Sequence, residues 1–314
     1  MEQTIISSSQ QILQQVRKVV VGKDNALLWV MAAILSGSHI LLEDIPGVGK
    51  TTMAVAFSKV LGLGYNRVQF TPDVLPSDVT GFTVLDQATG QMTYKPGAVL
   101  CNLFLADELN RATSRTQSAL LEAMEEQQVT VDGISHPIPK PFIVIATQNP
   151  TGAAGTQLLP DSQMDRFALR MSLGYPSPAD EMTMVLGRLK KNPMTELTPL
   201  LTPEQVVAMQ EEVSTTHISE PIVQYIVRLV TATRHNDQIL QGASPRATLC
   251  LASMSKAIAQ LSGRDYVVPE DIRSVFLRCI PHRLQLSPKA LSNDITPEQI
   301  LTQILDTIPA PQAG

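Results

Sequence analysis

The sequence predicts an α/β fold, in which a parallel sheet is covered by helices on both faces and is followed by a helical domain. Two observations predict this fold. Short apolar runs at 38–43, 100–106 and 142–146 have the length and composition of buried strands. Helical patterns lie between these runs, and strands that alternate with helices favour a parallel sheet with both faces buried.

The helices expected in the first half have apolar residues every three or four positions. They cover the ranges 8–21, 24–35, 51–61 and 114–127. Two hairpin patterns interrupt the alternation, at 81–99 and 128–140. The second has Asp132-Gly133 between two alternating runs, which is a strong turn signal. Both hairpins are expected to project from the core as insertions.

The second half of the chain has a different pattern. Prolines break the chain near residue 175. Beyond Thr202 the pattern is wholly helical, with helix starts at 202–204, 219–221 and 269–271. A chain of 314 residues is long enough for two domains. We therefore expect a large α/β domain over residues 1–190, which includes both hairpins, and a smaller helical domain over 191–314.

Composition and charge restrict the class of protein. Hydrophobic residues make up 44% and charged residues 17%, which favours a folded core over a disordered chain. The net charge of −5 makes nucleic acid an unlikely main partner. We expect no signal peptide and no membrane span, since no apolar stretch approaches about 18 residues. The three scattered cysteines form no Cys-x-x-Cys pair, which predicts reduced thiols and a cytoplasmic protein.

A glycine-rich loop, Gly47-Val48-Gly49-Lys50-Thr51, lies between an expected strand and an expected helix. Glycines allow the backbone N–H groups to turn toward an anion, and the helix N-terminus adds its positive dipole end. Lys50 is expected to reach the β- and γ-phosphates of a nucleotide, and the Thr51 hydroxyl to hold Mg²⁺. Asp44 occupies the first position, where glycine is usual, and we expect its carboxylate to point away from the phosphates.

Two acids, Asp107 and Glu108, end the buried strand at 100–106. Asp107 is expected to bind magnesium through water, and Glu108 to polarise the water that attacks the γ-phosphate. Asn149 follows the next strand and could orient the same water, and the alternative is an ordinary turn before a proline. By sequence alone, Arg166 and Arg246 fit surface ion pairs. An arginine finger must contact a γ-phosphate, and the spacing of residues in the sequence cannot show such a contact.

Taken together, these residues resemble the AAA+ superfamily and, within it, the MoxR family. The resemblance covers nearly the whole chain, and its most specific runs are 44–52, 69–81, 106–133 and 242–247. It implies a core with a five-stranded parallel sheet between helices, and a C-terminal helical lid. The hairpin at 81–99 is similar to the insertion in helix 2 of this clade, and the hairpin at 128–140 to the hairpin before the first sensor.

The resemblance also implies a role for each candidate residue. Lys50 and Thr51 look like the Walker A pair, and Asp107 and Glu108 like Walker B. The remaining roles are contact with ATP by Val21, Gly22, Gly47, Val48, Gly49 and Thr52, the first sensor for Asn149, an arginine finger acting in trans for Arg166, and the second sensor of the lid for Arg246. ATP and Mg²⁺ are the implied cofactors, with Thr51 and Asp107 at the metal.

The implied activity is ATP hydrolysis by a ring, expected to be hexameric, coupled to chaperone-like remodelling, maturation or activation of client proteins. A client with a von Willebrand factor A domain or a metal site fits this family. Three alternatives stay open: a DNA-directed motor, a scaffold that binds ATP with poor turnover, and a metal-inserting machine resembling magnesium chelatase. The hairpins carry few basic residues, Lys95 and Lys140, which argues against the DNA-directed motor.

Overall fold

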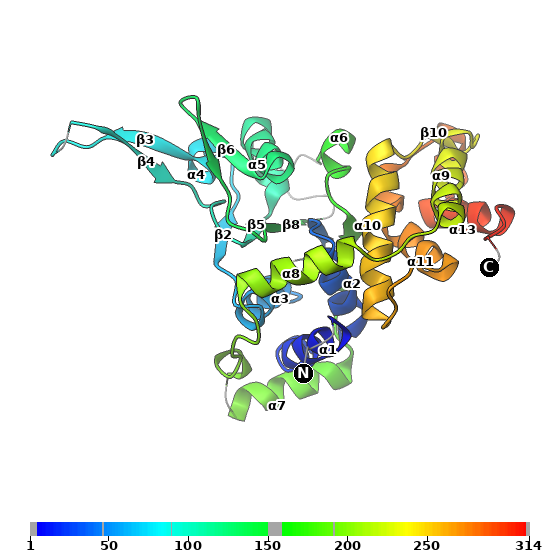
Figure 1. Ribbon diagram of the computed structural model, residues 1–314, viewed down its shortest axis with the longest axis horizontal. Coiled ribbons are helices and arrows are strands. Elements are labelled where there is room, and N and C mark those ends of the chain that lie inside the picture. Colours follow the sequence, from blue (N-terminus) through cyan, green and yellow to red (C-terminus); the bar gives the residue numbers. More distant parts are fainter. Residues whose placement is uncertain (1–4, 46, 89, 150–158, 191, 312–314) are drawn as a thin grey trace.

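The computed structural model describes residues 5–45, 47–88, 90–149, 159–190 and 192–311. Its centre is a five-stranded sheet in the order β2-β5-β8-β1-β9, in which every neighbouring pair is parallel (Figure 1). The strands are β1 Ile40–Glu43, β2 Tyr65–Gln69, β5 Leu103–Asp107, β8 Ile143–Gln148 and β9 Leu169–Met171. The expected α/β fold with five parallel strands is therefore confirmed.

The central strands β1, β5 and β8 form where the apolar runs were expected. Every residue of β5 and β8 is buried, because helices cover both faces of the sheet. The edge strands β2 and β9 were not predicted. All residues of β2 are at least partly exposed, and β9 has only three residues, so neither gives a buried apolar run.

Helices pack on the two faces and form two hydrophobic clusters. Alternate strand residues face opposite clusters: Phe104 and Val144 pack with α5, whereas Leu103 and Ile143 pack with α1, α2 and α3. The helices of this half are α1 Ile5–Arg17, α2 Asp24–Leu35, α3 Lys50–Val60, α4 Pro76–Thr80, α5 Ser114–Glu126, α6 Asp161–Met164 and α7 Pro178–Lys190, with a 3-10 turn, η1, at Leu109–Arg111.

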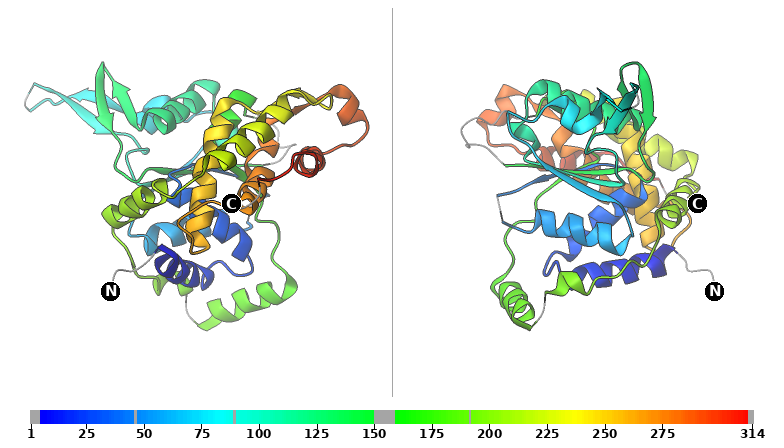
Figure 2. Two further views of the ribbon diagram at one scale, coloured as in Figure 1. Left: turned by 45° about the vertical axis from the view of Figure 1, so that its right-hand side comes forward. Right: turned by 90° about the vertical axis from the view of Figure 1, so that its left-hand side faces the viewer.

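Two antiparallel hairpins extend from one side of the molecule (Figures 1 and 2). They pair β3 Gly81–Leu85 with β4 Met92–Pro96, and β6 Gln128–Val131 with β7 Ile134–Pro137. The turn of the second hairpin has Asp132 at φ 50° and Gly133 at φ 78°, as a two-residue type I′ turn requires. The rings of Tyr94 and His136 stack with centroids 3.7 Å apart, so the hairpins contact each other.

The C-terminal part packs helices against the core, since one hydrophobic cluster runs from α2 and α3 into α10 and α11. Its elements are η2 Pro193–Thr195, α8 Pro203–Ser214, α9 Glu220–Arg234, β10 Ile239–Gln241, α10 Pro245–Leu261, α11 Pro269–Cys279, η3 Pro281–Arg283, β11 Gln285–Leu286, α12 Pro288–Ser292 and α13 Pro297–Thr307. The prediction of a wholly helical pattern is wrong at β10 and β11, which pair antiparallel. These strands are too short to give an alternating pattern.

Candidate functional site

The loop after β1 turns directly into helix α3. Gly47 and Gly49 have φ of 90° and 99°, a conformation that favours glycine. A Cβ at either position would meet no described atom within 4 Å, so the backbone conformation, not lack of space, requires glycine. Gly49 is the N-cap of α3, and the first N–H groups of this helix are therefore available to an anion.

The carboxylate of Asp44 is held by the segment that follows β9. It accepts hydrogen bonds from the Ser172 hydroxyl at 2.6 Å, the Leu173 backbone N–H at 2.6 Å and the Gly174 backbone N–H at 3.1 Å. These partners follow β9, the neighbouring strand of β1. The acid at the first loop position therefore ties the loop to the segment after β9.

Lys50 is buried at the base of the loop. Its Nζ donates to the carbonyl oxygens of Asp44 at 2.6 Å and Ile45 at 3.3 Å. Burial lowers the pKa of Lys50, whereas the nearby carboxylates of Asp44, Asp107 and Glu108 act to raise it. The ammonium group thus lies among three carboxylates, and an incoming phosphate would replace its carbonyl partners.

Asp107 is the last residue of β5, and both of its carboxylate oxygens have partners. Arg67 of β2 donates to Oδ2 from Nη2 at 2.7 Å and from Nε at 3.2 Å. Thr147 Oγ1 donates to Oδ1 at 2.7 Å. Sequence reasoning did not single out Arg67 or Thr147, because a polar edge strand and a threonine at a strand end are ordinary features.

Glu108 has a left-handed backbone with φ 56° and ψ 46°, which is uncommon for a residue other than glycine. The hydroxyl of Thr147 accepts its backbone N–H at 2.8 Å. Arg111 Nη1 donates to Oε2 at 2.9 Å, and Asn149 Nδ2 approaches Oε1 at 3.4 Å. The carboxylate is therefore oriented by two side chains, of which Arg111 was not predicted.

These groups meet in one cavity of about 290 Å³ at the carboxyl ends of the strands. Its lining comes from the loop, α3, β2, the end of β5 and the end of β8. Thr51 and Asp107 supply a hydroxyl and a carboxylate oxygen to the same cavity, which are donor types that suit Mg²⁺. The lining residues are Gly47, Gly49, Lys50, Thr51, Thr52, Arg67, Gln69, Asp107, Glu108 and Asn149.

A second cavity of about 400 Å³ adjoins the first and shares Gly47, Gly49 and Thr52 with it. Val21 and Val48 line it, as does α7, a helix that the sequence did not predict. The backbone of Gly22 has φ 72°, and a Cβ there would collide with the carboxylate of Asp180 on α7. The expected adenine contact at 21–22 therefore lies beside an apolar cavity next to the phosphate loop.

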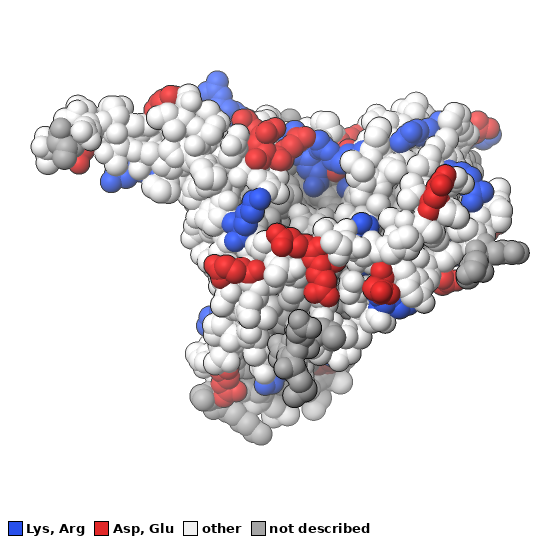
Figure 3. Space-filling view, in the orientation of Figure 1, with Lys and Arg blue, Asp and Glu red and all other residues white. Residues whose placement is uncertain are grey.

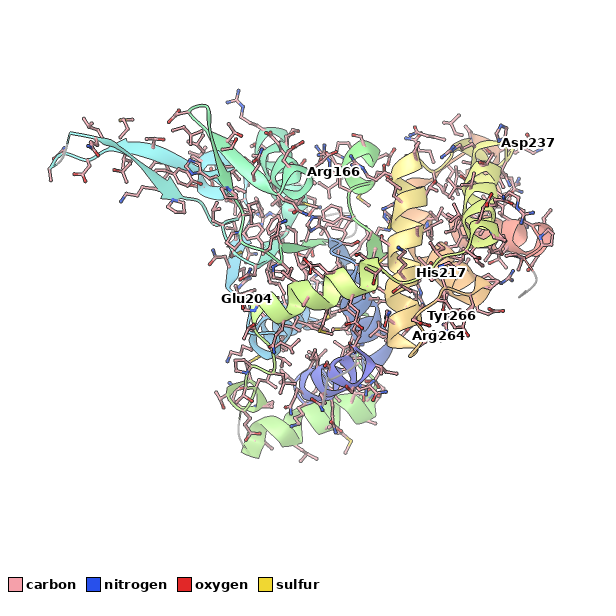
Figure 4. All side chains as sticks on the ribbon, viewed as in Figure 1. Arg166, Glu204, His217, Asp237, Arg264 and Tyr266 are labelled. Atoms are coloured by element: carbon pink, nitrogen blue, oxygen red, sulfur yellow. The ribbon has the colours of Figure 1, made fainter. Side chains whose placement is uncertain are left out.

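Arg166 and Arg246 do not line either of these cavities. They line a smaller one of about 160 Å³ with His39, Met124 and Glu125. Arg166 Nη2 lies 3.0 Å from Glu125 Oε2, and Arg246 Nη2 pairs with Glu125 Oε1. Figure 4 places Arg166 between α5 and α6. The structure thus brings the two predicted arginines together and separates them from Lys50 and Glu108.

The phosphate-loop cavity lies at the carboxyl ends of the strands, and the cavity with Arg166 and Arg246 lies at their amino ends. The phosphate loop follows β1, and Asp107 and Asn149 stand at or just after the ends of β5 and β8. His39 precedes β1, Arg166 precedes β9, and the Ala168 backbone N–H donates to the His39 carbonyl at 2.9 Å. Because these strands are parallel, residues that precede them and residues that follow them lie at opposite ends of the strands.

Comparison with known proteins agrees with this fold. Residues 39–169 match the ATPase family associated with various cellular activities, and residues 231–304 match an AAA lid domain. Chaperone MoxR1 of Mycobacterium tuberculosis is 37% identical over 96% of this chain and 81% of its own length. The chain belongs to the MoxR family of AAA+ ATPases. Bacillus subtilis YeaC is 42% identical over 95% of this chain and 93% of its own length.

A solved structure shares the whole architecture of this MoxR-family chain. The crystal structure of an ATPase candidate from Cytophaga hutchinsonii has a TM-score of 0.91 at 37% identity, and covers 97% of this chain and 95% of its own. As a member of an ATPase family, this chain binds and hydrolyses nucleotide. In the described ranges, we find neither a helix long and apolar enough to cross a membrane nor a His, Cys, Asp and Glu cluster that could hold a metal ion.

Proposed function

We propose that the phosphate-loop cavity binds ATP with Mg²⁺ and hydrolyses it only when a second copy of the chain supplies Arg166 and Arg246. The gathering of Lys50, Asp107 and Glu108 in one cavity, from three separate segments, is the observation that supports this proposal most strongly. We further propose that residues 1–190 form the nucleotide-binding core and residues 191–314 the lid.

Each part of ATP has a candidate partner. The apolar cavity beside Val21 and Gly22 suits the adenine ring, and the glycine loop with Val48 suits the α- and β-phosphates. Lys50 would bind the β- and γ-phosphates, and Thr52 lines both cavities. Thr51 and Asp107 would hold Mg²⁺, which when bound neutralises charge on the transferred phosphoryl group.

Hydrolysis needs a base, and Glu108 is the candidate. A water molecule held by Glu108 and Asn149 attacks the γ-phosphorus in line with the β–γ bridging oxygen. The water proton passes to the Glu108 carboxylate as the new P–O bond forms. The bond to the bridging oxygen breaks, and ADP leaves with that electron pair. Lys50 stabilises the developing negative charge.

The arginines are proposed to act in trans. Arg166 and Arg246 lie at the ends of the strands opposite the phosphate loop, so they are poorly placed to contact a nucleotide in the cavity of their own chain. A ring brings one edge of each subunit against the other edge of the next. Two guanidinium groups at such a boundary would stabilise the γ-phosphate of the neighbour in the transition state. From the family resemblance we expect six copies in the ring.

The mechanical output is proposed to reach client proteins through the two hairpins. Phe82, Leu85, Met92 and Ile134 are exposed there, and exposed apolar side chains on projecting hairpins suit contact with non-native protein. The name of the relative Chaperone MoxR1 supports a chaperone-like role in remodelling or activation. Clients with a von Willebrand factor A domain or a metal site are the class we favour. The three free cysteines suit the cytoplasm.

Steady-state hydrolysis tests the proposal. We expect Glu108→Gln to lower kcat by about 10²- to 10⁴-fold while ATP binding is kept. Lys50→Ala should abolish ATP binding, and Lys289→Ala, which replaces an exposed lysine on α12, should change neither quantity. Equal rates for wild type and Glu108→Gln would leave a nucleotide-gated scaffold as the better description. Stimulation by duplex DNA at physiological salt would favour a DNA-directed motor.

A further inference from the structure

Glu125 is the point at which three separate segments meet. It lies in the last turn of α5, and its carboxylate bridges Arg166, which follows α6, and Arg246, which begins α10. Acidic and basic side chains stand side by side over α5 and α6 in the space-filling view (Figure 3). Among the described residues that line this small cavity, one carboxylate faces two guanidinium groups, which leaves an excess of positive charge.

The ion pairs of Glu125 with Arg166 and Arg246 are of a kind that a competing anion can replace. The side chains of Glu125, Arg166 and Arg246 are 40%, 28% and 42% exposed, and ion pairs at such exposure contribute little net stability. Arg166 Nε is buried and has no hydrogen-bond partner among the described residues. A phosphate carries more charge and more acceptor oxygens than one carboxylate, so it competes well for both arginines.

Glu125 is also connected to the hairpins. The imidazole of His39 bridges the Met124 carbonyl, 3.2 Å from Nε2, and the Val144 backbone N–H, 3.0 Å from Nδ1, so it fixes the end of α5 to the sheet. The helix ends at Glu126, Gln127 caps it with a φ of 52°, and β6 begins at Gln128. Glu125 is therefore only three residues from the start of the hairpin at 128–137, so a change in its contacts can affect this hairpin.

We propose that Glu125 is a positioning residue that holds Arg166 and Arg246 together until the γ-phosphate of a neighbouring subunit takes both. This proposal rests on the trans role of the two arginines. Release of the carboxylate frees the end of α5 and the start of α10 from each other. The nucleotide state of one subunit then reaches the β6–β7 hairpin of the next through the final turn of α5, and through the Tyr94–His136 stack it reaches the other hairpin.

The full chain carrying Glu125→Gln tests this role, with Glu122→Gln as the matched control. Glu122 is exposed on the same helix and has no ion pair among the described residues. The probe is a non-hydrolysable ATP analogue with a β,γ-imido bridge, and assembly is followed by analytical ultracentrifugation. We expect half-maximal assembly of Glu125→Gln at an analogue concentration about fivefold lower than that of wild type, the low end of ordinary site-to-site coupling. Glu122→Gln should match wild type.

Amide hydrogen exchange in residues 128–137 gives the second readout. In wild type and in Glu122→Gln, adding the analogue should change exchange in this hairpin. In Glu125→Gln the hairpin should exchange alike with and without the analogue, because the carboxylate that couples it to the arginines is gone. If either readout of Glu125→Gln equals that of Glu122→Gln, the proposal is overturned.

A double variant separates this proposal from the one on which it rests. Arg166→Ala with Arg246→Ala should lose most hydrolysis and remove the effect of Glu125→Gln on assembly. If the double variant assembles and hydrolyses ATP like wild type, the trans role of the arginines fails. If it loses hydrolysis while Glu125→Gln behaves like Glu122→Gln, only the role of Glu125 fails.

Discussion

The phosphate-loop cavity and the arginine cluster differ in how the chain builds them. The first takes its groups from strand ends that lie side by side in one sheet, and its loop is a continuous run of residues. The second joins the end of α5, the segment after α6 and the first turn of α10. Among the residues that the structure describes, neither region holds all the charges that phosphoryl transfer uses.

This difference explains why a motor of this kind would need a neighbour. The phosphate-loop cavity holds a base, a lysine and metal-binding oxygens. Arg67, which lines it, pairs with Asp107, and the neighbouring Arg111 pairs with Glu108. The arginine cluster holds two cations that share one anion. Each region supplies what the other lacks, so contact between two copies would complete the site.

The largest expected effect is at the arginine cluster. Arg166→Ala should lower kcat by about 10³-fold with little change in ATP affinity, because an arginine finger acts on charge that develops in the transition state. Turnover and equilibrium binding of a fluorescent ATP analogue measure the two quantities. Turnover at the wild-type level would show that hydrolysis does not use this residue.

The next effect separates stability from binding at the phosphate loop. Asp44→Asn should lower the free energy of unfolding by about 2–3 kcal/mol, because three hydrogen bonds to a charged acceptor are weakened. ATP affinity should stay within about twofold, since the hydrogen-bond partners of the carboxylate lie after β9 and not in the loop. Urea unfolding and nucleotide binding measure these changes. A large loss of affinity without loss of stability would mean that Asp44 faces the phosphates.

Arg111 tests whether the orientation of the base matters. Arg111→Ala leaves Glu108 with the longer contact to Asn149 only, so we expect kcat to fall about tenfold with unchanged ATP affinity. Arg115→Ala, an exposed neighbour on α5, is the control. A faster rate in Arg111→Ala would instead indicate that this arginine restrains the base in an inactive position.

The smallest expected effect is a pH-dependent loss of stability caused by two buried histidines, His39 and His282. Burial lowers the pKa of His39 to about 4 and, helped by the neighbouring charge of Arg283, the pKa of His282 to about 3. In the unfolded chain both titrate near 6.5, so the unfolded state binds more protons below that pH and stability falls as pH drops from about 6.5 toward 4.

Each histidine should cost about 1.4 kcal/mol of stability between pH 7.5 and pH 5.5. Urea unfolding at the two pH values measures this loss. His39→Gln should reduce the loss by about 1.4 kcal/mol, the contribution of one histidine. His235→Gln, which replaces an exposed histidine, should leave the loss unchanged. An equal loss in all three proteins would contradict the buried neutral state of His39.

The sequence predicted the phosphate-loop region well because its signals are local. Glycines, lysine and threonine follow one another, and the acids directly follow a buried strand, as periodicity can detect. Arg67 escaped notice because β2 is a largely polar edge strand. Domain limits at 190 and 191 and the individual residue roles remain predictions.

The arginine cluster could not be predicted from the sequence. Arg166 and Arg246 were each recognised by resemblance, but their meeting at Glu125 depends on how α10 packs against the core. Glu125 is one of several acids on a solvent-facing helix surface, and no spacing marks it. Helix α7 was missed for a different reason, because its large apolar residues are exposed and are not gathered on one buried face.

Subunit mixing tests most directly the claim that two chains share one catalytic site. The Glu108→Gln chain keeps its arginines, and the Arg166→Ala chain keeps its phosphate-loop cavity, although each alone should be nearly inactive. Mixed in equal amounts with ATP, the two inactive chains should regain a substantial part of wild-type hydrolysis, because some boundaries pair an intact cavity with an intact Arg166. Mixed assemblies that stay as inactive as either chain alone would contradict the shared site.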